Sequence, residues 1–224
     1  MVCSNLQTAF IGVSMHSVQT HRLSTLHASE LEGMFRLRYD TFHTRLGWEV
    51  QCENGMERDH FDSESTVYII GKASDQSVDA CWRLLPTTGP YMLRDIFPEL
   101  LHGQAAPQAL DCWELSRFAV ATDRVPCGVD GFGEITVALM TESARFALQH
   151  GIKRIVTVTT TAIERLMKRQ GLHIHRIGPP IQIGVAMSVA CIIEIDEISF
   201  GAVGLSSPTV NCTSTHAHYQ VSTQ

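Results

Sequence analysis

The 224-residue sequence predicts one α/β domain in which a mixed β-sheet is flanked by helices on both faces. Three observations support this fold class. Short runs rich in Val, Ile and Thr alternate with helical patterns along the chain. Neither an internal repeat nor a linker interrupts that alternation. The length suffices for a substantial core, and a composition of 44% hydrophobic and 18% charged residues is typical of a globular protein.

The expected strands are short apolar runs bounded by turn residues. They lie at residues 17–20, 67–72, 78–85, 113–120, 154–160, 172–177 and 185–195. The expected helices combine apolar residues at helical spacing with a glycine just after the last turn. They lie at residues 28–46, 134–149 and 161–170, with a shorter helix or turn at 93–101. Ser29 is the expected N-cap of the first helix, and the polar segment 49–65 predicts a loop.

Composition limits the class of protein. We expect an N-terminal extension at 1–14, the domain at 15–205 and a flexible Ser/Thr/His-rich tail at 206–224. The net charge of −6 argues against a general nucleic-acid binder. Seven scattered cysteines without a C-x-x-C motif indicate reduced thiols. Apolar runs are too short for membrane insertion and a signal peptide is not apparent, so we expect a cytoplasmic protein.

The strand at 113–120 carries two charged residues, Glu114 and Arg117, in an otherwise apolar run. Burying an unpaired charge is costly, so each needs a partner. Side chains alternate faces along a strand, and residues three apart share a face only if the strand contains a β-bulge. Either a bulge brings both charges to one site, or the two are paired on opposite faces of the sheet.

Other charged residues stand beside aromatic residues on separate predicted elements. Together they form a balanced set of three cations and three anions: Arg38, Asp59, Asp62, Arg83, Glu114 and Arg117. Such a set is either a buried structural ion network or a polar pocket for a zwitterionic ligand. In the second case, Phe42 and Trp48 would face a cationic group of the ligand.

The order and spacing of these residues resemble the acyl-homoserine-lactone synthases, the bacterial autoinducer synthases. The resemblance extends over roughly residues 15–200. Its motifs are Arg38…Phe42…Trp48, Asp59…Asp62, Cys81-Trp82-Arg83, Leu85-Pro86-Thr87-Thr88-Gly89-Pro90-Tyr91, Trp113-Glu114-Leu115-Ser116-Arg117-Phe118 and Val156-Thr157-Val158-Thr159-Thr160.

The resemblance implies a fold like that of the GCN5-related N-acetyltransferases, with a splayed mixed sheet. It also implies an acyltransferase that makes an N-acyl-L-homoserine lactone, a quorum-sensing signal. The substrates would be S-adenosylmethionine (SAM) and an acyl group on acyl carrier protein. Amide formation and then lactonisation would release methylthioadenosine (MTA). SAM is therefore expected as a substrate, and neither a cofactor nor a metal is expected.

The resemblance further suggests roles for particular residues. Glu114 would be a general base acting through a water, and Arg38, Arg83 and Arg117 would position a carboxylate or brace the acidic loop. The residues expected around SAM are Arg38, Phe42, Trp48, Asp59, Asp62, Phe118 and Thr157. The residues expected to line the acyl chain are Phe132, Met140 and Thr159, and a threonine at position 159 points to a 3-oxo-acyl product. The residues expected to dock the carrier protein are Arg165, Lys168 and Arg169.

Several alternatives remain open. A GCN5-like acyltransferase could use acyl-CoA on another amine, although residues 124–129 do not match the usual [Gln/Arg]-x-x-Gly-x-[Gly/Ala] pyrophosphate loop. A non-catalytic regulator could bind SAM or the lactone. The glycine-rich segment 125–133 before a helix is either an anion site or a tight connection. His173-x-His175 lacks a third ligand, so surface histidines are expected there.

Overall fold

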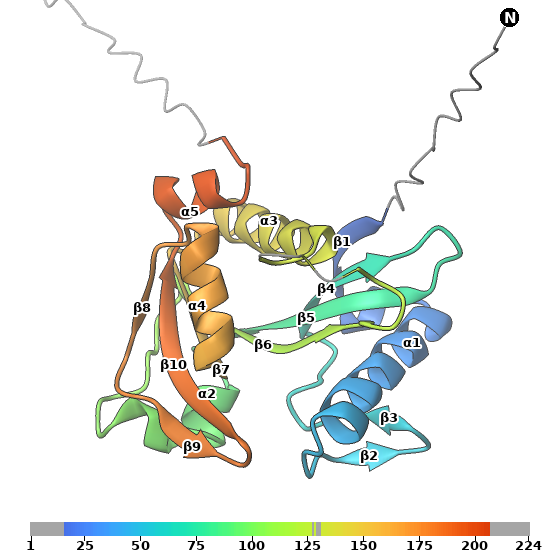
Figure 1. Ribbon diagram of the computed structural model, residues 1–224, viewed down its shortest axis with the longest axis horizontal. Helices are drawn as coiled ribbons and strands as arrows, with labels where there is room; N and C mark the ends of the chain where they lie inside the picture. The colour runs from blue at the N-terminus through green and yellow to red at the C-terminus, as the bar shows by residue number, and fades with distance from the viewer. Residues whose placement is uncertain (1–15, 127, 129–130, 207–224) are drawn as a thin grey trace, which may run out of the picture.

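The computed structural model describes residues 16–126, 128 and 131–206 (Figure 1). In this part of the chain, an eight-stranded sheet has the order β1-β4-β5-β6-β7-β10-β8, and β9 pairs with β10. Its strands are β1 (Ser17–Arg22), β4 (Val67–Lys72), β5 (Val78–Pro86), β6 (Cys112–Val120), β7 (Arg154–Thr160), β8 (Ile174–Arg176), β9 (Ile181–Ile183) and β10 (Ala186–Glu194). A separate hairpin consists of β2 (Cys52–Glu53) and β3 (Met56–Glu57).

Helices cover both faces of the sheet. They are α1 (Ala28–Tyr39), α2 (Met92–Asp95), α3 (Glu134–Gln149), α4 (Thr161–Gln170) and α5 (Glu197–Ala202), with the short η1 (Leu23–Thr25), η2 (Asp40–Arg45) and η3 (Pro98–Leu101). Helix α1 packs on β5 and β6, whereas α3 packs on β1, β4 and β5 from the other side (Figure 1). Helix α4 packs on β7 and β10. The predicted mixed sheet between helices is thus confirmed.

Strands β6 and β7 form the parallel pair at the centre of the sheet. Their ladder joins only 112–115 to 154–157, although both strands continue further. At the last rung the Thr157 hydroxyl donates to the Leu115 carbonyl at 3.0 Å. Beyond that rung the strands diverge (Figure 1), which confirms the splayed sheet.

A β-bulge interrupts the pairing of β5 with β6. Cys81 pairs with Ala119 and Arg83 with Ser116, so Trp82 stands opposite two residues, Arg117 and Phe118. Arg117 has φ 57°, in the left-handed region that side chains rarely adopt. The bulge, one of the two predicted arrangements, is therefore confirmed. Without the extra residue, Arg117 would point to the face on which Phe118 lies; with it, Arg117 points to the opposite face.

The first helix and the following segment differ from the expectation. His27 is the N-cap of α1 and Ser29 lies inside the helix, because the Glu30 carboxylate accepts the backbone N–H of His27 at 3.0 Å. After Tyr39 the helix continues as a π-helix, η2. The predicted loop at 49–65 contains the hairpin β2–β3, whose turn residues Asn54 and Gly55 both have positive φ. Strand β9 and helix α5 were not predicted.

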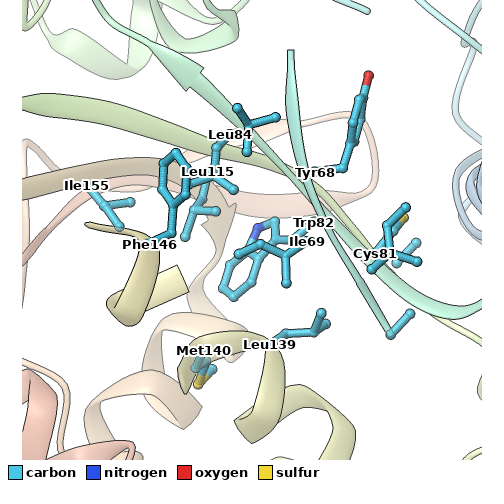
Figure 2. Packing of buried hydrophobic residues seen from close by; sticks show 14 of the residues in the cluster. Tyr68, Ile69, Cys81, Trp82, Leu84, Leu115, Leu139, Met140, Phe146 and Ile155 are labelled. Atoms are coloured by element: carbon cyan, nitrogen blue, oxygen red, sulfur yellow. The ribbon is translucent and has the colours of Figure 1, made fainter. Parts of the chain in front are cut away.

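The main hydrophobic cluster contains residues of the sheet, α3 and α1, and a second cluster lies around α2 and η3. In Figure 2, Leu139 and Met140 of α3 lie beneath Ile69 and Trp82, while Tyr68 points away from α3. The described residues contain no helix with the length and apolar character needed to cross a bilayer. The predicted extension at 1–14 and nearly all of the predicted tail lie outside the described residues, so the domain boundaries stay predictions.

Replacing Leu139 with Ala should destabilise the domain strongly. Leu139 is fully buried, and truncating such a side chain costs about 2–5 kcal/mol because a cavity remains. Leu148→Ala on the same helix is the matched control, since Leu148 is 41% exposed. Urea unfolding followed by circular dichroism would measure both variants. Equal losses of stability would contradict the packing of α3 described above.

Candidate functional site

A buried ion network lies on the face of the sheet that α1 covers. Arg38 of α1 is fully buried, and its Nε donates to Glu57 Oε2 at 2.5 Å. The two terminal nitrogens of Arg38 donate to the carboxylate of Asp62 at 2.8 and 2.9 Å. This bidentate pairing fixes the guanidinium plane and attaches the 59–62 segment to α1.

Two further arginines complete the network from β5 and β6. Arg83 Nη1 donates to Asp59 at 2.6 Å and to Asp62 at 2.8 Å, and its Nε donates to the Ser116 hydroxyl at 3.1 Å. Arg117, aimed by the bulge, donates from Nε to Glu57 at 3.1 Å, and its Nη2 forms an ion pair with Asp59 Oδ2 at 2.8 Å. Each arginine therefore contacts at least two carboxylates, and Arg38 Nη2 also lies 4.0 Å from Asp59 Oδ2.

Asp62 is the acceptor that most of these groups share. Its carboxylate accepts hydrogen bonds from Arg38, Arg83, the Tyr68 hydroxyl and the backbone N–H of Asp59. Burial alone would raise the pKa of Asp62, but the neighbouring arginine charges and hydrogen bonds outweigh it and hold this pKa well below its ordinary value. Asp62 is thus ionised at any pH at which the protein works.

The three arginines are balanced by three carboxylates, but the set differs from the predicted one. Glu57, and not Glu114, supplies the third anion, and its side chain is fully buried. Glu57 was missed because a two-residue strand shows no periodicity. The spacing Glu57-x-Asp59 was the available signal, since alternate residues of an extended segment share a side.

Glu114 is buried next to this network without an ion pair of its own among the described residues. Its two oxygens accept the backbone N–H groups of Met92 at 2.9 Å and Leu93 at 2.7 Å, in the first turn of α2. Burial raises the pKa of Glu114 to about 7, although the two backbone hydrogen bonds act in the opposite direction. Glu114 therefore changes its charge near neutral pH, unlike Asp62.

The aromatic candidates do not all lie together. Phe42, on the π-helix η2, is 4% exposed; its ring centroid is 5.4 Å from that of Trp48 and 5.3 Å from the Arg117 guanidinium carbon. Trp48 is only partly buried, so it is the more accessible ring of the pair. Phe118 lies on the opposite face, where its ring centroid is 5.2 Å from that of Trp82.

The other predicted residues occupy two separate regions. Phe132 and Met140 belong to the main hydrophobic cluster, and Thr159 is a partly buried residue of β7 opposite Val189. The Thr157 hydroxyl is bonded to the β6 backbone, as described above. Neither Phe118 nor Thr157 is brought into the ion network.

The basic residues predicted for docking lie on α4. Arg165, Lys168 and Arg169 are exposed, and Lys168 donates to Glu164 at 2.7 Å. Arg176 of β8, which was not predicted, also binds Glu164, at 2.8 and 2.5 Å. The hydrogen bonds from Arg176 lower the pKa of Glu164 to about 2, although burial opposes them. The buried Glu164 carboxylate thus holds Lys168 of α4 and Arg176 of β8 at the basic face of α4.

Two grooves lie beside α1. One, of about 770 Å³, is lined by α1, the β2–β3 hairpin and residues 58–60, and among the predicted site residues only Asp59 lines it. The other, of about 550 Å³, is lined by α1, η2, the β4–β5 turn and residues 120–124, and contains none of the predicted residues.

The histidine pair of the sequence analysis lies at the surface, as expected. His173 Nδ1 lies 2.5 Å from Asp196 and His175 Nε2 lies 3.7 Å from Glu194. No cluster of three His, Cys, Asp or Glu side chains that could hold a metal occurs among the described residues. Part of the glycine-rich segment 125–133 lies outside the described residues.

Comparison with known proteins gives a consistent result. The sequence model of the autoinducer synthase family matches residues 22–203. An acyl-homoserine-lactone synthase of Pseudomonas aeruginosa is 41% identical over 181 residues, which cover 80% of this chain and 89% of that protein. The crystal structure of the AHL synthase LasI aligns with a TM-score of 0.77 at 41% identity, covering 85% of this chain and 95% of LasI.

More distant structures agree in fold. BjaI, a CoA-dependent acyl-homoserine lactone synthase solved with SAM and isopentyl-CoA, aligns with a TM-score of 0.75 at 27% identity, over 86% of this chain and 92% of BjaI. An N-acetyltransferase fold from Lactobacillus plantarum aligns with a TM-score of 0.55 at 13% identity, over 81% of this chain and 99% of that chain, which shows likeness of fold alone.

The family match spans most of the chain, and the relatives share about two fifths of their residues with it over most of their own length. The fold is the splayed sheet of the GCN5-related N-acetyltransferases. The chain therefore belongs to the autoinducer synthase family, and it is an acyl-homoserine-lactone synthase.

Proposed function

We propose that this synthase transfers an acyl group from acyl carrier protein to SAM and then closes the lactone. The observation that carries the proposal is the position of Glu114, a buried carboxylate with a pKa of about 7 beside a neutral ion network. A general base is most effective when its pKa lies near the working pH. Glu114 is thus suited to accept a proton from the methionyl ammonium of SAM, through a water.

The reaction proceeds in two steps in this proposal. The free amine attacks the thioester carbonyl, the amide C–N bond forms and the carrier thiolate leaves and takes up a proton. The methionyl carboxylate then attacks its own γ-carbon, and the C–S bond breaks to release neutral MTA. Neither step needs a covalent enzyme intermediate, because holding the chain curled brings the carboxylate to the γ-carbon.

The remaining residues would position SAM. Arg38 and Arg83 are fully buried and engaged by carboxylates, so bracing the acidic loop is their better-supported role. Arg117 has a 9% exposed side chain and is the arginine best placed to meet a substrate carboxylate. Trp48 offers the accessible aromatic surface, and the buried Phe42 ring stacks against it. Asp62 holds Arg38 and Arg83 in place.

The basic face of α4 supports acyl carrier protein as the donor and docking partner, since carrier proteins are acidic. BjaI shows that a relative takes acyl-CoA instead, which makes acyl-CoA the second candidate donor here.

Phe132, Met140 and Thr159 are proposed to line the acyl chain, with a 3-oxo group near Thr159. The four cysteines among the described residues, all free thiols, fit the expected cytoplasmic location.

Mass spectrometry of the reaction product tests the whole proposal. Purified protein incubated with SAM and a pool of 3-oxo-acyl and unsubstituted acyl carrier proteins should yield a 3-oxo-acyl-homoserine lactone and MTA. A parallel pool of acyl-CoA thioesters should react more slowly. A lactone formed only from acyl-CoA would reject the carrier protein, and an unsubstituted product would reject the 3-oxo assignment.

Glu114→Gln should lower kcat by about 100-fold or more, the usual contribution of a positioned general base, while SAM still binds. In the wild type, kcat should fall as pH drops below about 7, because Glu114 then takes up a proton; the variant should lack this dependence. Asp79→Asn is the control, since Asp79 is buried but pairs with Arg124 away from the site. Unchanged turnover in Glu114→Gln would remove Glu114 as the base.

Reversing the charges of Arg165 and Arg169 should raise the KM for carrier protein, because both lie on the exposed α4 face. The increase should be largest at low salt, where charge attraction is least screened, and kcat should change little. Reversing the exposed Arg36 and Arg145, on α1 and α3, gives a control with the same net charge. Equal KM values for the two double variants would place the docking face elsewhere.

A further inference from the structure

Met92, the first residue of α2, touches three of the four residues predicted to act in catalysis. Its sulfur lies 3.1 Å from Arg83 Nη2 and 3.3 Å from Arg117 Nη1. Its own backbone N–H donates to Glu114 at 2.9 Å. Met92 is 6% exposed, so these contacts are sheltered from water.

A thioether suits this position for an electrostatic reason. The three arginines are already balanced by three carboxylates, so a further anion would leave the site with a net buried charge. A hydrocarbon would leave Arg117 Nη1 without its acceptor, because the described residues give that nitrogen no other hydrogen-bond partner. A neutral, polarisable sulfur accepts from both guanidinium groups without adding charge.

We infer that Met92 is a positioning residue whose sulfur holds the Arg83 and Arg117 guanidinium groups at a fixed place beside Glu114. The bulge makes this necessary, because Arg117 adopts a positive φ and depends on its side-chain contacts to stay there. The backbone of Met92 holds Glu114 while its side chain holds the arginines. Met92 thereby sets the position of Glu114, the proposed base, relative to Arg117, which is proposed to bind the substrate carboxylate. The inference therefore rests on the proposed function.

Two substitutions separate an acceptor role from simple packing. Met92→Leu keeps the volume and removes the acceptor, whereas Met92→Gln keeps a similar length and supplies an amide oxygen. If Met92 only fills space, leucine is the better replacement. If the sulfur acts as an acceptor, glutamine is better, although it places an amide in a buried site.

The experiment measures kcat, the KM values for SAM and the acyl donor, and the pH profile of the wild type and both variants. Met92→Leu should lower kcat about tenfold with little change in the donor KM, as for loss of a hydrogen bond to a charged group, and Met92→Gln should recover most of it. The acidic limb of the Met92→Leu profile should move to higher pH, because a displaced Arg117 no longer lowers the pKa of Glu114. Met34→Leu, a fully buried methionine of α1, is the matched control and should be unaffected.

Met92→Leu as active as the wild type, or more active than a folded Met92→Gln, would overturn the inference. If thermal unfolding shows that Met92→Gln does not fold, the pH profile of Met92→Leu decides, and an unmoved acidic limb rejects the acceptor role. Failure of the proposed function gives a different result. The wild type itself would then form no lactone from any donor.

Discussion

The pairing of three arginines with three carboxylates, of which all but Arg117 and Asp59 are fully sheltered, is the constraint on which the rest of this structure depends. Arg38, Arg83 and Arg117 come from α1, β5 and β6, and Glu57, Asp59 and Asp62 come from one short segment beneath α1. Buried ions are costly unless each is matched, so the network forms only when all these elements are in place. The network thus joins the first helix to the central strands and fixes the positions of the charged residues in the candidate site.

The bulge in β6 and the four-residue helix α2 place Arg117 and Glu114 where the proposed catalysis needs them. Without the extra residue, Arg117 would point to the face occupied by Phe118 and Trp82, and Glu57 would lose its second partner. Helix α2 supplies two backbone N–H groups to Glu114, so this carboxylate is held without an arginine. Burial acts to raise both pKa values; it prevails in Glu114, whereas in Asp62 the neighbouring arginine charges and hydrogen bonds together outweigh it.

Much of the fold was predictable where local pattern and tertiary structure agree. Strand β7 and helices α3 and α4 have the predicted bounds, because a Val- and Thr-rich run is followed by helical periodicity and a glycine. Ser29 failed as the cap because the side chain of Glu30 stabilises the start of α1 from within the helix.

The site was predictable in its charged residues but not in its partners. The choice between a bulge and opposite faces at Glu114 and Arg117 needed the register of β5 and β6, which one strand alone does not contain. Glu57 was missed because its two-residue strand carries no period. Arg176 lies in a predicted strand, but its partner Glu164 lies twelve residues away on α4, and the pattern of the strand does not indicate that pairing. Met92 and Arg117 are 25 residues apart and Met92 is apolar, so no pattern of charges in the sequence predicts their contact.

The balance of three cations against three anions in this network also restricts which substitutions the sequence can accept. Losing a single member, for example Asp62, would leave an uncompensated buried charge that costs about 3–5 kcal/mol, a large part of the stability of a typical domain. Replacing a matched cation and anion together by apolar residues avoids that cost. Members of the network are therefore expected to change in compensating pairs, so that inheritance of one ion constrains inheritance of its partner on a distant element.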